Sequence, residues 1–229
     1  MITQPKVKSV RFVNFTSGEK APVNTLRWDV NGTDLGIPVY SVKENALWLF
    51  YGDTFATPLP SDVNWRGTVI GKTHNFDFSH GVMYSGFVPD DDGNALGLIV
   101  HHKSDNEDYY ERTKICQGAV EVDGVMYAFY ESIRHWGEPG YWDVNYSGAI
   151  KSRDGGKTWQ RVYDLTWTAD NDKYRDVVKR LAEEDVARAW TMGLAPQSYL
   201  MQISAPLYVV ISANSANVDI VEAGKMYYR

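Results

Sequence analysis

Two aspartates stand at one end of a predicted β-hairpin, where they could act as an acid and a base. The runs DLGIPVYSV (34–42) and ALWLFYGDTF (46–55) flank a short polar turn, which predicts two antiparallel strands. Asp34 opens the first strand and Asp53 closes the second, so the two fall nearly opposite each other. Opposed residues have Cβ atoms about 5 Å apart and diagonal ones about 7–8 Å apart. Carboxyl groups at such separations are the pair that glycoside hydrolysis uses.

The residues around these aspartates favour a catalytic role, and a purely structural role is the alternative. Leu-Gly-Ile-Pro follows Asp34 and Thr-Phe follows Asp53, so both emerge from apolar segments. Burial would raise the pKa of one carboxyl and suit it to donate a proton. We expect inversion, because a carboxyl separation above about 6.5 Å leaves room for the attacking water. The alternative is that both residues cap turns at strand ends.

A second group of polar and aromatic side chains surrounds a predicted loop between two strands. Aromatic faces stack on sugar rings and polar groups bind hydroxyls, so we expect this group to bind substrate. Its members are Glu131, Arg134, Trp136, Trp142, Asn145 and Tyr146. His80, in another loop between strands, could also touch a substrate. The alternatives are a loop that packs on its own aromatic rings and a solvated loop histidine.

The composition narrows the class of partner. The chain has 229 residues, 44% of them hydrophobic, and a net charge of −6 with no block of Lys or Arg. Such a charge argues against nucleic acids and anionic membranes as partners. No apolar run is long enough to span a bilayer, and the start MITQPKVKSV does not resemble a signal peptide. These residues leave open a cytosolic protein, a virion component or a secreted protein whose leader has been removed. Of these, we expect action outside the cell, as a secreted mature form or as a phage or virion component.

No cofactor is expected to be required. The histidines and the one cysteine, Cys116, lack the spacing of a zinc site. Cys116 precedes an apolar strand, so a buried, inert thiol is expected there. Two Gly-Lys-Thr triplets, at 71–73 and 156–158, lack the upstream glycine of a phosphate-binding loop. A structural calcium ion in a central channel remains compatible with the sequence.

The predicted strands come in local groups, which is typical of a β-propeller. Residues 152–159, Ser-Arg-Asp-Gly-Gly-Lys-Thr-Trp, match the turn called an Asp box, which recurs in propellers and is expected to be structural. Each propeller blade is a small sheet that is local in sequence and packs on the next. Four such groups are predicted, near residues 33–60, 66–103, 115–165 and 197–226, with a strand at 7–15 completing the last.

One segment departs from this pattern. Residues 169–190 place Tyr174, Val177, Val178 and Leu181 at helical spacing between charged positions. The segment is therefore predicted to be an amphipathic helix inserted between blades, and residues 1–229 to form a single propeller domain.

Two stretches resemble the family called domain of unknown function 4185. They are DLGIPVY…LWLFYGDTF…WRGTVIGKT and the run from Arg134 to Gly148, which holds Arg-x-Trp and Gly-x-Trp-x-x-Asn-Tyr-Ser-Gly patterns. Characterised members of that family include endo-D-arabinanases. The resemblance implies a five-bladed propeller with its active site at one mouth of the channel and catalytic carboxylates in the first blade, which match Asp34 and Asp53. The helical insertion and the count of only four blades depart from the family pattern.

Two functions are compatible with these features, and a third draws only on the Asp box. The first is a glycoside hydrolase that cuts a furanose polysaccharide such as arabinan. The second is a binding module, such as a phage tail or cell-wall recognition domain, that holds glycan without cutting it. The third, a sialidase, needs three arginines around a carboxylate, and no motif places the arginines at 27, 66, 112 and 134 in that way.

Overall fold

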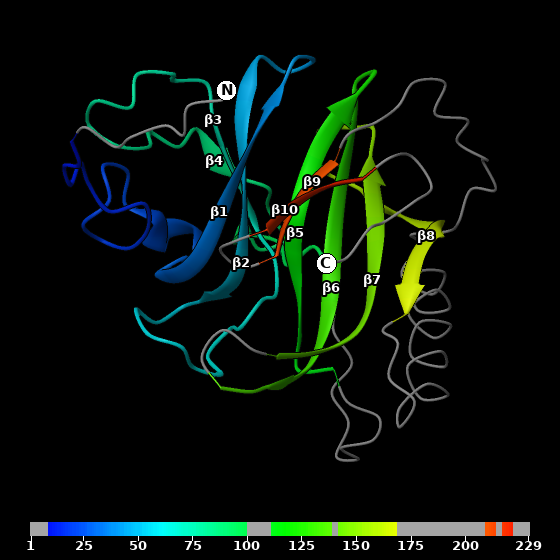
Figure 1. Ribbon diagram of the computed structural model, residues 1–229. Coiled ribbons are helices and arrows are strands. Elements are labelled where there is room, and N and C mark those ends of the chain that lie inside the picture. Colours follow the sequence, from blue (N-terminus) through cyan, green and yellow to red (C-terminus); the bar gives the residue numbers. More distant parts are fainter. Residues whose placement is uncertain (1–8, 100–110, 139–141, 169–208, 214–216, 222–229) are drawn as a thin grey trace.

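Antiparallel β-sheets make up the described part of the chain. The computed structural model describes residues 9–99, 111–138, 142–168, 209–213 and 217–221 (Figure 1). The first sheet contains, in order, β1 (Gly32–Ser41), β2 (Ala46–Phe55), β3 (Ile70–Thr73) and β4 (Gly86–Phe87). The second contains β5 (Thr113–Val122), β6 (Val125–Trp136), β7 (Trp142–Ser152) and β8 (Gln160–Thr168). A two-stranded sheet contains β9 (Val209–Ala213) and β10 (Asn217–Val221).

The all-β class is therefore confirmed, whereas the predicted grouping of strands is partly wrong. The groups at 33–60 and 66–103 form one sheet, because β3 pairs with β2 from Leu47 to Phe50. The group at 115–165 agrees with β5–β8, and the last hairpin agrees with β9–β10. The number of blades stays a prediction, and the helix predicted at 169–190 lies outside the described residues.

Two predicted strands are not present as predicted. In the run 95–102, the described residues 95–99 make only an isolated bridge at Ala95, and the buried side chains of Leu98 and Ile99 pack into the core. Residues 9–15 form no strand, and Val10 and Phe12 are 88% and 74% exposed. A strand needs a partner ladder, and none is present for 9–15 among the described residues.

The two four-stranded sheets pack face to face over a hydrophobic core. Trp48 and Phe50 of β2 meet Met126 and Tyr130 of β6 in this core. Burying side chains of this size contributes about 1.5–3 kcal/mol each. Neighbouring residues of β2 point the other way, where Leu49 and Tyr51 join a second cluster under the N-terminal segment. β2 therefore buries side chains on both of its faces, in a different cluster on each.

The Asp-box turn between β7 and β8 joins the two sheets. Asp154 accepts hydrogen bonds from the backbone N–H of Thr158 at 3.0 Å and from its hydroxyl at 2.6 Å. Trp159 is buried and lies edge-on to Phe50 of the first sheet, with ring centroids 6.2 Å apart. Lys72 of β3 donates to the carbonyl of Gly155 at 2.6 Å. These contacts give the turn a structural role.

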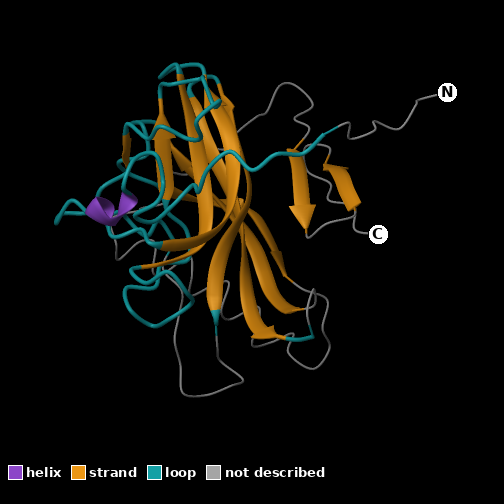
Figure 2. Cartoon of the chain, turned by 90° about the vertical axis from the view of Figure 1, so that its left-hand side faces the viewer, coloured by secondary structure: helices purple, strands orange, loops and turns teal. Residues whose placement is uncertain are grey.

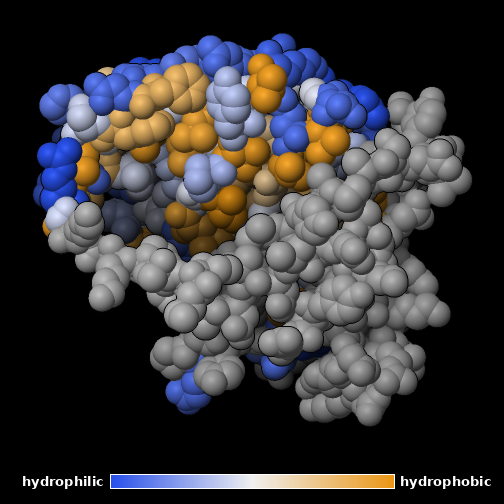
Figure 3. All heavy atoms as spheres, turned by 45° about the horizontal axis from the view of Figure 1, so that its top comes forward, coloured by the Kyte–Doolittle hydropathy of each residue, from blue (hydrophilic) through white to orange (hydrophobic). Residues whose placement is uncertain are grey.

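Loops and one short helix surround the first sheet. The 3-10 helix η1 (Thr25–Trp28) lies among loops at the edge of the molecule (Figure 2). Hydrophobic side chains also reach the surface of the described part, between polar ones (Figure 3). Among them, the rings of Tyr40 and Phe76 lie 5.8 Å apart. No described helix is long and apolar enough to cross a bilayer.

Candidate active site

A β-bulge places Asp34 beside Asp53. The ladder between β1 and β2 shifts register on both sides of Leu35, and the first shift lies between the pairs Thr33 with Thr54 and Leu35 with Tyr51. Between these pairs, the single residue Asp34 faces both Gly52 and Asp53. Two residues against one define a β-bulge, a feature that is common beside active sites because it re-aims side chains. The predicted opposition of the two aspartates is therefore observed.

The same bulge turns Asp53 toward the second sheet. Strict alternation would put Asp53 on the face of Leu49 and Tyr51, away from the core between the sheets. Instead, Asp53 Oδ1 accepts a hydrogen bond of 2.7 Å from the hydroxyl of Thr113, at the start of β5. The extra residue in β2 has moved this side chain to the other face of the strand.

The backbone after Asp34 adopts an uncommon conformation. Leu35 has φ 61° and Gly36 has φ 92°, so two successive residues lie in the left-handed region. A residue other than glycine seldom adopts this region, and such strained backbone gathers at functional sites. Gly36 also lies against the ring of Tyr51, where an added Cβ would be 3.1 Å from Cε1. This turn fixes the direction in which Asp34 leaves the strand.

Gly52 makes room for the carboxyl group of Asp34. A Cβ at Gly52 would overlap Asp34 Oδ1 and would lie 2.9 Å from Cδ1 of Leu35 and 3.1 Å from Cγ2 of Ile115. The Asp34 carboxylate also accepts a hydrogen bond from the backbone N–H of Asp53. The two carboxyl groups therefore occupy neighbouring positions on the bulge.

Asp34 is exposed to solvent, yet enough protein surrounds its carboxyl group to displace part of the water around it. Its pKa is raised from 3.8 to about 6, first because the surrounding protein displaces water and second because the charge of Asp53 repels a second negative charge. Hydrogen bonds from backbone N–H groups act in the opposite direction. Asp34 is thus able to hold a proton close to neutral pH.

Asp53 is more deeply buried, with 8% of its surface exposed, and its anion is better supported. Burial raises its pKa, while hydrogen bonds from Thr113 and Trp65 and the charge of Arg112 lower it. The indole Nε1 of Trp65 donates to Asp53 Oδ1 at 2.8 Å. A carboxylate that accepts such bonds is stabilised in its charged form.

The charge of Asp53 affects the titration of Asp34. Like charges at close range do not both ionise readily, so the anion of Asp53 raises the pKa of Asp34. The donors around Asp53 favour its anion, whereas the anion of Asp53 favours the proton on Asp34. One protonated and one ionised carboxyl form an acid and a base in one site.

Trp136 and Trp142 lie at the end of the second sheet that is nearer to the acidic pair. The start of β1 pairs with the end of β2, and Asp53 of β2 binds Thr113 at the start of β5. Thr113 in turn pairs with Ile133, near the end of β6. Trp136 is 44% exposed and pairs with Trp142 across the β6–β7 ladder. Trp136 is therefore an aromatic surface on the side of the molecule that carries the acidic pair.

Four other predicted binding residues are buried. Arg134, Asn145 and Tyr146 are 1%, 0% and 0% exposed, so the described structure places them inside the protein. Asn145 donates to the hydroxyl of Ser132 at 3.1 Å. Glu131 is nearly buried and accepts a hydrogen bond of 2.7 Å from Gln117 of β5. Through these contacts Asn145 and Glu131 help to hold β5, β6 and β7 together.

A buried ion pair that the sequence analysis missed anchors the start of β5. Glu111 and Lys114 are both 0% exposed, with 3.3 Å between Oε2 and Nζ. Glu111 also accepts hydrogen bonds from Tyr146 at 2.6 Å and Ser132 at 3.0 Å. A buried charge pair needs such partners to offset the loss of hydration. Arg112 and Thr113, the neighbours of Asp53, lie between its two members.

His80 lies away from the acidic pair. Its loop leaves the first sheet after β3, at the end where His74 Nδ1 lies 3.2 Å from the carbonyl of Asn45. Asp53 is near the opposite end of β2. His80 is exposed, and its carbonyl accepts a hydrogen bond of 3.4 Å from Asn14. The described structure therefore does not bring His80 to the pair.

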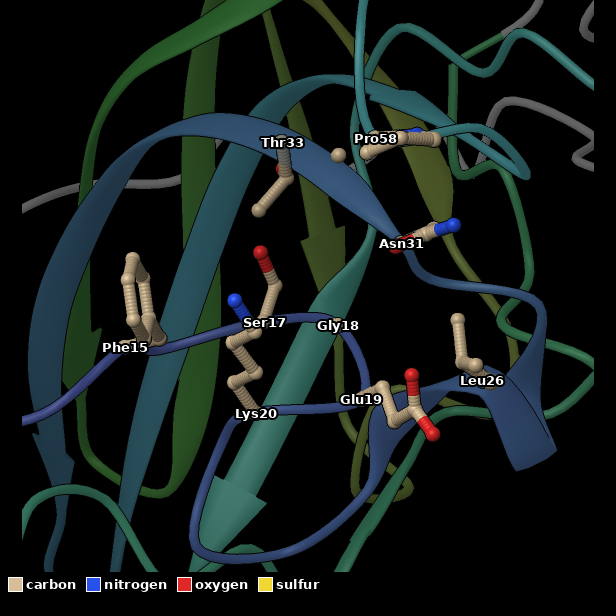
Figure 4. A pocket seen from close by; sticks show the side chains of 10 residues that line it. Phe15, Ser17, Gly18, Glu19, Lys20, Leu26, Asn31, Thr33 and Pro58 are labelled. Atoms are coloured by element: carbon tan, nitrogen blue, oxygen red, sulfur yellow. The ribbon is translucent and has the colours of Figure 1, made fainter.

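A separate pocket lies beside β1. It encloses about 500 Å³ between the N-terminal segment and the start of the strand, and Ser17 and Thr33 point toward each other across it (Figure 4). Its lining includes Glu19 and Lys20 but none of the predicted site residues. The described residues contain no group of three or more His, Cys, Asp or Glu side chains that could hold a metal ion. The described residues therefore offer no such ligand group for the structural calcium ion that the sequence left open.

The fold and site define an all-β protein with paired carboxyl groups on a bulged hairpin. The chain belongs to the family described as Domain of unknown function (DUF4185), whose model matches residues 20–214. The resemblance noted in the sequence is therefore confirmed at the level of the family. No curated protein matches the sequence.

Proposed function

We propose that the chain is a glycoside hydrolase that cleaves a furanose polysaccharide, with Asp34 as general acid and Asp53 as general base. The observation that carries the proposal is the bulge that sets these two carboxyl groups side by side in different environments. Glycoside hydrolases use this combination of one protonated and one ionised carboxyl.

The proposed reaction needs only the two carboxyl groups and a water molecule. Asp34 donates its proton to the glycosidic oxygen as the bond from that oxygen to the anomeric carbon breaks. Asp53 removes a proton from water as the water oxygen bonds to the same carbon. After each cycle the proton returns from Asp53 to Asp34 through solvent. The inversion expected from sequence stays a prediction, to be tested by following the anomeric configuration of fresh product by NMR.

D-Arabinan is the substrate that we propose, with cleavage within the chain. Membership of the family supports it through the likeness to arabinan-cutting members, and the exposed ring of Trp136 offers a face on which a sugar could stack. A polysaccharide of this kind lies outside the cell, so we propose extracellular action by a secreted or virion-associated form. No step requires a cofactor, and a calcium ion would have a structural role only.

The experiment is incubation of the purified chain with D-arabinan, followed by analysis of released oligosaccharides. D34N and D53N should each lower the rate by about 10²–10⁴-fold, the usual contribution of general acid–base catalysis. D123N is the matched control, because Asp123 lies in the β5–β6 turn with φ 50°, a conformation that asparagine also adopts. Circular dichroism should show that all three variants fold. Full activity of both site variants would refute the assignment.

A glycan-binding module is the second candidate, and the exposed Trp136 favours it independently of the carboxyl groups. Such a module would retain arabinan in a pull-down but release no fragments on long incubation. In that case W136A would lose retention, while D34N and D53N would still bind. Release of fragments by the wild type would instead exclude a purely binding role.

A further inference from the structure

One oxygen of Asp53 receives hydrogen bonds from two separate parts of the fold. Trp65, in the connection between β2 and β3, donates to Oδ1 at 2.8 Å. Thr113, the first residue of β5 in the other sheet, donates to the same oxygen at 2.7 Å. Hydrogen bonds to a charged oxygen are short and strong, and two of them fix the orientation of the carboxyl plane.

The other oxygen of Asp53 has a different environment. Among the described residues, the hydrogen bonds to the Asp53 carboxyl group end on Oδ1. Oδ2 is therefore the oxygen that remains to accept a proton. A base works best when the oxygen that takes the proton is aimed and its partner is held by donors.

Neighbouring residues hold both donors, Trp65 and Thr113, in place. Thr113 is fully buried and follows Arg112, whose backbone N–H donates to the carbonyl of Ile133 at 2.6 Å. The guanidinium carbon of Arg112 lies 5.9 Å from the centre of the Trp65 ring. Trp65 also packs against Phe55, with ring centroids 6.0 Å apart. Both donors thus belong to packed structure that is present before any ligand binds.

We propose that Trp65 and Thr113 are positioning residues, which hold Asp53 through Oδ1 and leave Oδ2 to take the proton of the attacking water. This inference rests on the proposed function, in which Asp53 is the base. Neither residue touches the substrate in this proposal; each acts through the carboxyl group of Asp53. Their loss should therefore lower kcat more than it changes KM.

The test compares T113V, T113S and W65F with the wild type in two measurements. Valine keeps the shape of threonine without the hydroxyl, serine keeps the hydroxyl, and phenylalanine removes the indole N–H. The first measurement is a carbon-13 NMR titration of the aspartate carboxyls, with D34N and D53N used to assign the signals. The second is the pH dependence of arabinan cleavage. T73V is the control, because the buried hydroxyl of Thr73 donates to the carbonyl of Met83 at 2.6 Å, near the opposite end of β2.

T113V and W65F should each shift the Asp53 titration to higher pH and lower kcat by about 10-fold to 100-fold, the cost of a misplaced catalytic group. T113S should keep most of the wild-type Asp53 titration and kcat, and T73V should change neither quantity. An Asp53 titration that is the same in T113V, W65F and the wild type would overturn the inference. If the titration shifts but no protein cleaves arabinan, the positioning stands and the hydrolase assignment falls. T113S and W65F keep the test decisive should T113V fold poorly.

Discussion

The bulged end of the β1–β2 hairpin and the Asp-box turn of β7–β8 both place aspartates at the end of a hairpin, with opposite results. In the Asp box, burial alone would raise the pKa of Asp154, but hydrogen bonds from Thr158 and Ser152 outweigh it and lower the pKa. On the bulge, burial dominates, and the pKa values of Asp34 and Asp53 are both raised. Hydrogen bonds thus favour the anion in the Asp box, whereas burial raises the pKa of both aspartates on the bulge.

The difference lies in how the local backbone uses the carboxyl oxygens. Asp154 lies within a turn whose own N–H and hydroxyl groups bind both of its oxygens. Asp34 lies on an irregular ladder, beside a second carboxylate, with solvent at one side. A carboxyl group whose hydrogen bonds are all satisfied by its own turn supports structure. A carboxyl group that has a raised pKa, and whose own turn does not satisfy both of its oxygens, is available for proton transfer.

The largest expected effect comes from alanine substitutions at two glycines, Gly52 beside the acidic pair and Gly156 in the Asp-box turn. G52A should reduce arabinan cleavage by about 100-fold, because the added methyl group would displace the Asp34 carboxyl from its productive position. G156A should instead lower the free energy of unfolding by about 1–3 kcal/mol, since alanine is strained at such a backbone conformation. Gly156 has φ 83°, and its Cβ would lie 3.1 Å from the Trp48 ring. Cleavage rates and urea unfolding of both variants check this contrast.

G86A is the matched control for both glycine variants. A Cβ at Gly86 meets no atom within 4 Å, and its φ is not positive, so activity and stability should stay at wild-type values. An active G52A, or a G156A that loses activity without losing stability, would remove the distinction between the two regions.

Part of this distinction could be predicted from sequence. The turn after Ser41 and the apolar runs on each side define the hairpin, and a hairpin with this turn places Asp34 and Asp53 at the same end. The Asp box carries its own signal, because the Ser, Asp, Gly, Thr and Trp that make its hydrogen bonds lie within eight positions. Both features are local, and local patterns are what sequence spacing reports.

The bulge could not be predicted in the same way. Residues 46–55 are mostly apolar on both faces, so no alternation shows that Asp53 changes side after Gly52. The donors Trp65 and Thr113 come from other parts of the chain. Trp65 opens the WRGTVIGKT run that resembles the family, but its spacing from Asp53 predicts no hydrogen bond between them. The merging of the first two strand groups follows from the pairing of β2 with β3 across a long connection. These features depend on packing between segments distant in sequence.

The next effect in size concerns the anion of the Asp box. D154N should lower the free energy of unfolding at pH 7 by about 1 kcal/mol, because hydrogen bonds to a charged group weaken when the group becomes neutral and exposed sites are screened. The pKa of Asp154 is lowered from 3.8, so its stabilising effect is present above that pH and is lost as pH falls further. The deficit of D154N should therefore shrink below pH 4 in urea unfolding, while arabinan cleavage per folded molecule stays unchanged. A deficit independent of pH would mean that the charge of Asp154 contributes nothing.

A stability effect of the opposite sign belongs to Asp34. Its pKa rises from 3.8 in an ordinary setting to about 6 in the folded protein, so the folded state binds the proton more tightly. The favourable contribution of the protonated form is complete below 3.8 and is lost as pH rises through about 6. D34N should therefore unfold at higher urea than the wild type at pH 8, and this advantage should fade toward pH 4. Because D34N is also expected to be inactive, a stability gain together with lost cleavage would show that the bulge keeps a destabilising carboxyl for its chemistry. A D34N protein that is less stable than the wild type at pH 8 would mean instead that Asp34, like Asp154, is held there for structure.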